Sequence, residues 1–181
     1  MQRFRIIFSG SGGQGIITAS IIFAETAVLY EKLNAVQTQT YGAQARGGAT
    51  RSEVIISDSA IYFPKVIQPN ILVCLTQESY NKYYTLIRPN GLLITDSNYV
   101  EIQKRVDARH KQLPMYKYVM ENIGNPSVAN VCMLGALQTL TNIVNMESLI
   151  KVLETRTPAN FFEMNKKALD LGVQLAQKVK D

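Results

Sequence analysis

The sequence FRIIFSGSGGQG, residues 4–15, determines how the chain begins to fold. Its apolar half, Phe4 to Ser9, is short and uninterrupted, which predicts a buried β-strand. The glycine-rich half predicts a tight turn that brings backbone amides to the start of a helix. Apolar residues with helical spacing follow over residues 14–32, on so much of the circumference that the helix must be covered on more than one side.

The middle of the chain continues this alternation of strands and helices. A brief strand is predicted at residues 35–38, and a hairpin over residues 50–64 turns at Asp58-Ser59. A near-continuous apolar run at residues 71–76 is typical of a central strand buried on both faces. A helix at residues 77–87 and strands at residues 92–96 and 116–119 complete this part.

The last third of the chain is predicted to be helical. Asn125-Pro126 and Thr157-Pro158 each place a capping residue before a proline, which predicts helices over residues 126–142 and 158–179. A shorter helix lies at residues 147–154. We therefore expect one domain, residues 1–181, with three-layer α/β/α architecture. Its sheet is mixed but mainly parallel, its start is Rossmann-like and its C-terminal part is helical.

Composition narrows the classes of function. The 181 residues are 46% hydrophobic and 18% charged, with 19 basic and 14 acidic residues and a net charge of +5. No apolar run is long enough to cross a membrane and the start lacks a signal-peptide pattern, so a cytoplasmic protein without membrane contact is expected. No nucleic-acid-binding motif accompanies the positive charge. The densest basic stretch is interpreted as a solvated helix face: Lys104, Arg105, Arg109, His110, Lys111 and Lys117.

Residues for catalysis are few. Cys74 and Cys132 lie in apolar runs, which predicts buried free thiols and no zinc or iron–sulfur site. His110 is the only histidine and lies between two cations. Asp96, at a predicted strand end, is the one acid with a plausible site position. The sequence shows no nucleophile–base pair and no metal-ligand spacing, so we expect no catalytic or metal-binding residue and no activity from this chain alone.

The glycine turn can be tested against known phosphate-binding motifs. Gly10, Gly12 and Gly15 fit the G-x-G-x-x-G dinucleotide fingerprint, but residues 36–40 (VQTQT) supply neither the acid for a ribose nor an arginine for a 2′-phosphate. The same missing acid argues against a methyltransferase. Ile16-Ile17 stands where a P-loop requires Lys-Ser/Thr, which excludes an NTPase. A purely structural turn without a ligand remains an alternative.

A second loop, YGAQARGG at residues 41–48, combines an arginine with two glycines. Such a loop can offer a guanidinium and free amides to a carboxylate or phosphate. Arg46 can equally pair with a carboxylate of a partner subunit. The candidate residues for coenzyme A or phosphate binding, or for a subunit interface, are Gly10, Gly12, Gly13, Gln14, Gly15, Tyr41, Arg46, Gly47 and Gly48.

Taken together, these stretches resemble the gamma subunits of 2-oxoacid:ferredoxin oxidoreductases. The matching elements are SGSGGQGIITA, QTYGAQARGGATRSEVIIS, FPKV with ILVCLTQESY, PNGLLITDS, and near the end Asn130, Leu134-Gly135-Ala136 and Asn165-x-x-Ala168-x-x-x-Gly172. The 2-oxoglutarate enzymes are the most similar type. Pyruvate enzymes carry an arginine in the first loop, where this chain has Ser11, and Ala43-Gln44 departs from the commoner Pro-Glu.

The resemblance implies a division of labour within a complex. Thiamine diphosphate, magnesium and iron–sulfur clusters are held mainly by other subunits, and this chain is expected to hold no cofactor of its own. The implied partners are alpha, beta and ferredoxin-like delta subunits, with ferredoxin as electron acceptor. The two glycine loops would face the region where coenzyme A arrives, while the assembled enzyme converts 2-oxoglutarate to succinyl-CoA.

Several alternatives stay open at this point. The chain could serve an enzyme for pyruvate or a branched-chain 2-oxoacid, since other subunits would build most of the substrate pocket. It could also be a free-standing dinucleotide-binding protein, or a non-catalytic adaptor whose glycine loop has lost its ligand. Low charge and broad apolar helix faces further predict that the isolated chain self-associates.

Overall fold

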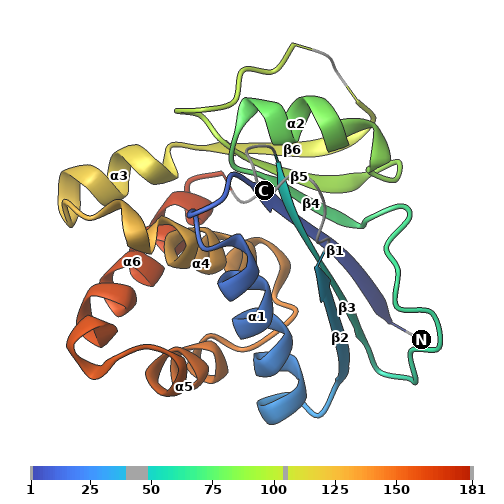
Figure 1. Ribbon diagram of the computed structural model, residues 1–181, viewed down its shortest axis with the longest axis horizontal. Helices are drawn as coiled ribbons and strands as arrows, with labels where there is room; N and C mark the ends of the chain where they lie inside the picture. Colours follow the sequence, from blue (N-terminus) through green and yellow to red (C-terminus); the bar gives the residue numbers. More distant parts are fainter. Residues whose placement is uncertain (1, 40–48, 104–105, 180–181) are drawn as a thin grey trace.

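The computed structural model describes residues 2–39, 49–103 and 106–179, and its centre is a six-stranded mixed sheet in the order β2-β3-β1-β4-β5-β6 (Figure 1). Only β3 runs against the other strands, pairing antiparallel with β1 and β2, while β1, β4, β5 and β6 are parallel. The strands are β1 (Arg3–Gly10), β2 (Asn34–Gln39), β3 (Thr50–Ser57), β4 (Ile71–Cys74), β5 (Gly91–Asp96) and β6 (Ala108–Leu113). The predicted mixed, mainly parallel sheet is confirmed.

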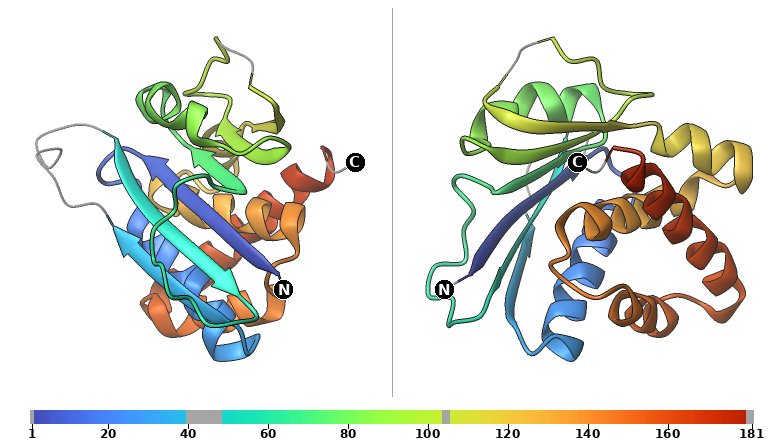
Figure 2. Two further views of the ribbon diagram at one scale, coloured as in Figure 1. Left: turned by 90° about the vertical axis from the view of Figure 1, so that its right-hand side faces the viewer. Right: turned by 180° about the vertical axis from the view of Figure 1, so that it is seen from behind.

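Helices cover both faces of this sheet, which gives three layers (Figures 1 and 2). On one face lie α1 (Ile16–Tyr30), α3 (Met115–Asn122), α4 (Ala129–Thr141), α5 (Met146–Arg156) and α6 (Ala159–Gln177). The other face carries α2 (Gln77–Tyr83), which continues as a 3-10 turn, η2 (Tyr84–Leu86). A second 3-10 turn, η3 (Pro126–Val128), precedes α4. Among the described residues, none of the helices combines the length and apolar character needed to cross a membrane.

The strand period explains why β1 is apolar without interruption. Ile6 and Phe8 point to the α1 side, where the Phe8 and Phe23 rings pack edge to face with their centroids 6.2 Å apart. Ile7 points to the α2 side and joins a second core with Tyr80 and other residues. All three β1 side chains are fully buried, and each such burial contributes roughly 1.5–3 kcal/mol.

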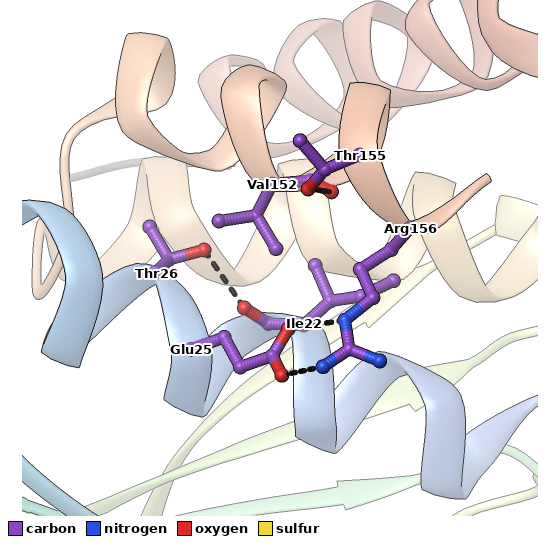
Figure 3. A network of polar contacts seen from close by, with 6 residues as sticks. All are labelled: Ile22, Glu25, Thr26, Val152, Thr155 and Arg156. Atoms are coloured by element: carbon purple, nitrogen blue, oxygen red, sulfur yellow. Dashed lines mark hydrogen bonds and ion pairs between the residues drawn. The ribbon is translucent and has the colours of Figure 1, made fainter. Parts of the chain in front are cut away.

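Contacts between helices complete the α1 side of the molecule. Helices α4 and α6 approach closely at two glycines: an added Cβ at Gly135 would overlap the Leu169 carbonyl, and one at Gly172 the Cys132 carbonyl. These two positions of the family pattern are therefore set by helix packing. Arg156 of α5 reaches across to Glu25 of α1 and pairs with it through both Nε and Nη2 (Figure 3).

The predicted hairpin at residues 50–64 is wrong. β3 pairs with β1 and β2 instead, and residues 60–64 form no strand. Ser57 bonds the Ser59 hydroxyl at 3.0 Å, and the Asp58 carboxylate accepts the Gln2 amide at 2.9 Å, so the turn is tied to the start of β1. Pro64 has no N–H for a ladder. β3 itself is central, and the buried residues Val54, Ile55 and Ile56 cover both of its faces.

The last strand also differs from the prediction. Residues 116–119 lie in α3, whereas β6 occupies residues 108–113, a stretch interpreted from sequence as a solvated helix. β6 is an edge strand and is therefore polar: His110 meets Thr95, and Lys111 donates to the Val179 carbonyl. Lys104 and Arg105 of that basic stretch lie outside the described residues.

The two predicted helix caps have different outcomes. Asn125 accepts the Ser127 amide at 3.0 Å and so caps the turn that leads into α4, as predicted. Thr157 does not cap α6, because its hydroxyl donates back to the Leu153 carbonyl of α5 at 2.6 Å. Its side chain ends the preceding helix rather than starting the next.

Candidate functional site

A pocket of about 310 Å³ lies at the carboxyl ends of the parallel strands. After β1 the chain turns into α1 on one face of the sheet, and after β4 it turns into α2 on the other. Open α/β sheets bind ligands at such a point, where the direction of winding changes. The glycine turn, the ends of β4 and β5, and the starts of α3 and η3 line the pocket, among them Gly13, Gln14, Leu75, Asp96, Tyr99 and Ser127.

The glycine turn is braced from within. The Gln14 side chain folds back so that its Oε1 accepts the Ser11 amide at 2.8 Å, and it fills the space beside Gly10 that a Cβ would need. Gly13 and Gly15 have φ angles of +83° and +69°, which favour glycine. An added Cβ at Gly12 would meet nothing within 4 Å, so the chain itself gives no steric reason for glycine there.

The amides of this turn are available to a ligand. Within the described part of the chain, no protein acceptor bonds the amides of Gly12 and Gly13. They precede the first turn of α1, where backbone N–H groups and the helix dipole favour an anion. The geometry of the turn therefore suits a phosphate or carboxylate oxygen.

Asn130 of α4 supports the turn from behind. Its Nδ2 donates to the Gly15 carbonyl at 3.2 Å, and a Cβ at Gly15 would run into the Asn130 side chain. The Asn130 Oδ1 is buried and has no hydrogen-bond partner among the described residues. Residue 15 thus requires glycine for two reasons, its positive φ and this contact.

Asp96 is the central charged group of the pocket. Its side chain is only 4% exposed, and its two oxygens accept the amides of Asn98 at 2.9 Å and Tyr116 at 2.8 Å. Burial raises the pKa of the carboxyl, and these two hydrogen bonds oppose the rise. Asp96 is the last residue of β5, so its predicted position at a strand end is confirmed.

Two tyrosines that sequence reasoning missed stand beside this carboxyl. The rings of Tyr99 and Tyr116 pack edge to face with centroids 5.0 Å apart. Tyr99 is 41% exposed, and partial desolvation, the hydrogen bond to Tyr116 and the nearby Asp96 charge raise its pKa to about 12. The only sequence signal for these two tyrosines is that each follows the end of a strand by a few residues, Tyr99 after β5 and Tyr116 after β6.

The second glycine loop, with Tyr41, Arg46, Gly47 and Gly48, lies outside the described residues, but the residues that flank it are placed. Gly10 at the end of β1 pairs with Thr50 at the start of β3. Ala49 donates its amide to Glu78 in the first turn of α2 at 3.2 Å. After the second loop, the chain therefore re-enters the sheet at Ala49 and Thr50, beside Gly10.

Other chemistries find little support in the described residues. His110 lies on the α2 side and bonds Thr95 at 2.9 Å, and burial lowers its pKa. Both thiols are buried as predicted, and burial raises the pKa of Cys74 and of Cys132 to about 12. In the described ranges, His, Cys, Asp and Glu side chains form no group of three that suits a metal ion.

Strand order also argues against a dinucleotide site of the usual kind. In the usual dinucleotide-binding fold, the second strand lies next to the first, so that an acid at the end of the second strand reaches the ribose. Here β3 separates β1 from β2, which moves the end of β2 to about twice the usual strand spacing of roughly 4.8 Å. Gln37 of β2 is already engaged, donating to Ser52 at 2.8 Å.

Comparison with known proteins agrees with this architecture. The family model described as pyruvate ferredoxin/flavodoxin oxidoreductase matches residues 5–175. The 2-oxoglutarate synthase subunit KorC of Methanocaldococcus jannaschii is 46% identical over 98% of this chain and 96% of its own. The pyruvate synthase subunit PorC of Methanothermobacter thermautotrophicus is 25% identical over 97% of each chain. A crystal structure of a keto/oxoacid ferredoxin oxidoreductase gamma subunit from Geobacter sulfurreducens superposes with a TM-score of 0.88 at 38% identity, covering 97% of this chain and 99% of that one.

Proposed function

The chain belongs to the pyruvate ferredoxin/flavodoxin oxidoreductase family, and we propose that it is the gamma subunit of a 2-oxoglutarate:ferredoxin oxidoreductase. The observation that carries the proposal is the end-to-end match to a 2-oxoglutarate synthase subunit at 46% identity, against 25% for a pyruvate synthase subunit. The assembled enzyme would decarboxylate 2-oxoglutarate, form succinyl-CoA and pass electrons to ferredoxin. Enzymes for pyruvate or a branched-chain 2-oxoacid are the alternatives.

The donor groups of this chain suit one part of that chemistry. Thiamine diphosphate with its magnesium, and the iron–sulfur clusters, need carboxylates or cysteines gathered in space. The described residues offer no such group, so alpha, beta and delta subunits would hold these cofactors. Coenzyme A brings phosphates, and the amides of Gly12 and Gly13 are donors of the right kind for a phosphate oxygen.

We assign the glycine turn and the second loop to the face turned toward coenzyme A. The first turn alone would be incomplete, because Asp96 is the only charged residue among the described residues that line the pocket, and a carboxylate repels phosphate. Arg46, with Gly47, Gly48 and Tyr41, would add the positive charge and further amides that an anion needs. Gln14 would act indirectly, by holding the turn in shape through Ser11.

The subunit assignment is tested on the complex from native cells. The tagged chain is purified under anaerobic conditions, its partners are identified by mass spectrometry, and coenzyme-A-dependent dye reduction is measured with three substrates. We expect thiamine- and cluster-bearing subunits, with activity on 2-oxoglutarate exceeding that on pyruvate and on 3-methyl-2-oxobutanoate. A preference for either other acid would assign the chain to that enzyme, and a chain that purifies alone and inactive contradicts the proposal.

A separate measurement addresses the two other classes of function. Thermal shifts of the purified chain are compared with NAD, NADP and coenzyme A. A ligand present at 100 times its dissociation constant stabilises by about 2.7 kcal/mol, which a melting curve detects. A shift with NAD or NADP alone would favour a dinucleotide-binding protein. A complex whose activity tolerates mutations in both loops would favour an adaptor.

A further inference from the structure

The segment of residues 62–68, between β3 and β4, lies on the outside of the sheet, away from α1, α4 and α6 (Figure 1). It is fixed at Val66, which is buried. Two β3 side chains bond both backbone polar groups of Val66, as the backbone of a neighbouring strand would do. Glu53 accepts a hydrogen bond from its amide at 2.7 Å, and Arg51 donates to its carbonyl at 2.9 Å. Arg51 and Glu53 pair at 2.7 Å, which locks the anchor.

The outer side of this anchored segment carries three large apolar side chains beside the polar Lys65 and Gln68. Tyr62, Phe63 and Ile67 are 92%, 58% and 69% exposed, and they are gathered within six residues of sequence. A chain that merely connected two strands would gain nothing from large apolar side chains held in water. Clusters of this kind usually mark a contact surface.

A basic hollow of about 690 Å³ adjoins the segment, lined by Arg5, Phe63, Lys65, Ile67, Gln68 and Arg88 among others. Among the described residues, none that lines the hollow is acidic, and no carboxylate lies within ion-pair distance of its three cations. Arg5 stands at the start of β1 and Arg88 just before β5, so the hollow is at the opposite end of the sheet from the pocket. A protein docked here would leave the glycine turn accessible.

We infer that residues 62–68, together with Arg5 and Arg88, form the docking surface for an acidic, apolar-containing surface of another subunit of the same complex. The inference rests on the proposed function for the existence of that complex. Charge complementarity selects the occupant: carboxylates would neutralise the three cations, and apolar side chains would cover Phe63 and Ile67. A second copy of this chain fits less well, because a two-fold contact through this face would bring like charges together.

The test uses the complex purified from native cells through a tag on this chain. A zero-length carbodiimide reagent, which joins amines to carboxylates in contact, should link Lys65 to an Asp or Glu of an identified partner subunit. Lys166 on α6 is the matched control, since it is exposed but distant from the hollow in the fold. Links from Lys65 only to another copy of this chain, or links from Lys166 alone, contradict the inference.

Variants provide the second arm of the test. Phe63→Ser with Ile67→Ser, and Lys65→Glu with Arg88→Glu, should each lower recovery of the linked subunit at least tenfold. Lys166→Glu, at an exposed residue of α6 distant from the hollow, should leave recovery unchanged. Circular dichroism melts verify that each variant folds, and the crosslink on the unaltered chain decides the matter if one does not.

The outcomes separate the inference from the function on which it rests. If the unaltered chain recovers its partners and the hollow variants recover them equally well, the docking surface is wrong and the subunit assignment stands. If the unaltered chain recovers no partner subunit, both are wrong.

Discussion

Gly10, the last residue of β1, lies directly opposite Thr50, the first residue of β3. The glycine turn leaves the sheet from one of these residues, and the second loop enters it near the other. The glycine turn that follows Gly10 and the residues that follow the second loop, Ala49 and Thr50, therefore lie at the same end of the sheet. This register gives a structural basis for treating both loops as one candidate site.

We predict that Arg46→Ala in the assembled enzyme raises the KM for coenzyme A tenfold or more. A charge-assisted hydrogen bond to a phosphate contributes roughly 1.5–3 kcal/mol, and its loss should appear mainly in that constant. Steady-state dye reduction with varied coenzyme A measures it, and Arg46→Lys, which keeps the charge, should recover part of the effect. An unchanged KM together with unchanged yield of the complex contradicts the assignment.

Alanine substitutions at Gly12 and Gly13, whose amides no acceptor bonds in the described part of the chain, should differ in their effect on stability. Gly13 has a φ of +83°, so Gly13→Ala should lower the free energy of unfolding by about 1–2 kcal/mol. Gly12 has open space around it, and Gly12→Ala should change that free energy by less than about 0.5 kcal/mol. Urea unfolding of the purified chain compares them. Equal losses would mean that the turn has a different conformation.

The ion pair that anchors Val66 should contribute far more than a surface pair. Arg51 and Glu53 have side chains only 17% and 13% exposed, and Glu53→Ala would leave the Arg51 charge buried without its partner. We expect a loss of about 3 kcal/mol in the free energy of unfolding. Lys117→Ala, which breaks the exposed pair with Glu121, should cost under about 0.5 kcal/mol. Similar losses for the two variants would rule out a special role for the anchor.

His110 should make the protein less stable in mild acid. Burial lowers its pKa in the folded chain, so below the unfolded value of about 6.5 the unfolded state binds more protons. The free energy of unfolding should therefore fall between pH 7 and pH 5, and fall less in His110→Asn. The pKa of Asp96 is raised instead, but the wild-type protein and the His110→Asn variant share this residue. The difference between their pH profiles therefore isolates the contribution of His110. Parallel pH profiles would contradict this prediction.

Much of the architecture could be predicted because its signals are local. The apolar run of β1, the glycine turn and the helix after it are set by neighbouring residues, as are the paired proline signals near the C-terminus. β6 could not be read in this way, because an edge strand such as Ala108–Leu113 carries polar residues on both faces and lacks an apolar pattern. The false hairpin arose because β3 alternates like a hairpin strand while its true partners are remote in the sequence.

The residues of the candidate site also differ in whether a local sequence signal identifies them. Its glycines and Asp96 could be identified from spacing and strand ends. Tyr99 and Tyr116 could not, because only tertiary packing brings them to the pocket. Asn130 could be noted as a position of the family pattern, but its contact with Gly15 could not be predicted. The unpaired Oδ1 of Asn130 depends on a fit between α4 and the glycine turn that no local pattern contains.

The placement of β3 between β1 and β2 also constrains how the protein is made. When the first 39 residues have left the ribosome, both outer strands of this part of the sheet exist, but they have no ladder in common. These two strands can be joined only after Ser57 has been synthesised, when β3 pairs with β1 along one edge and with β2 along the other. Until then neither the β1–β3 nor the β2–β3 ladder can form, so translation of residues 40–57 is the interval in which this chain is most exposed to misassociation.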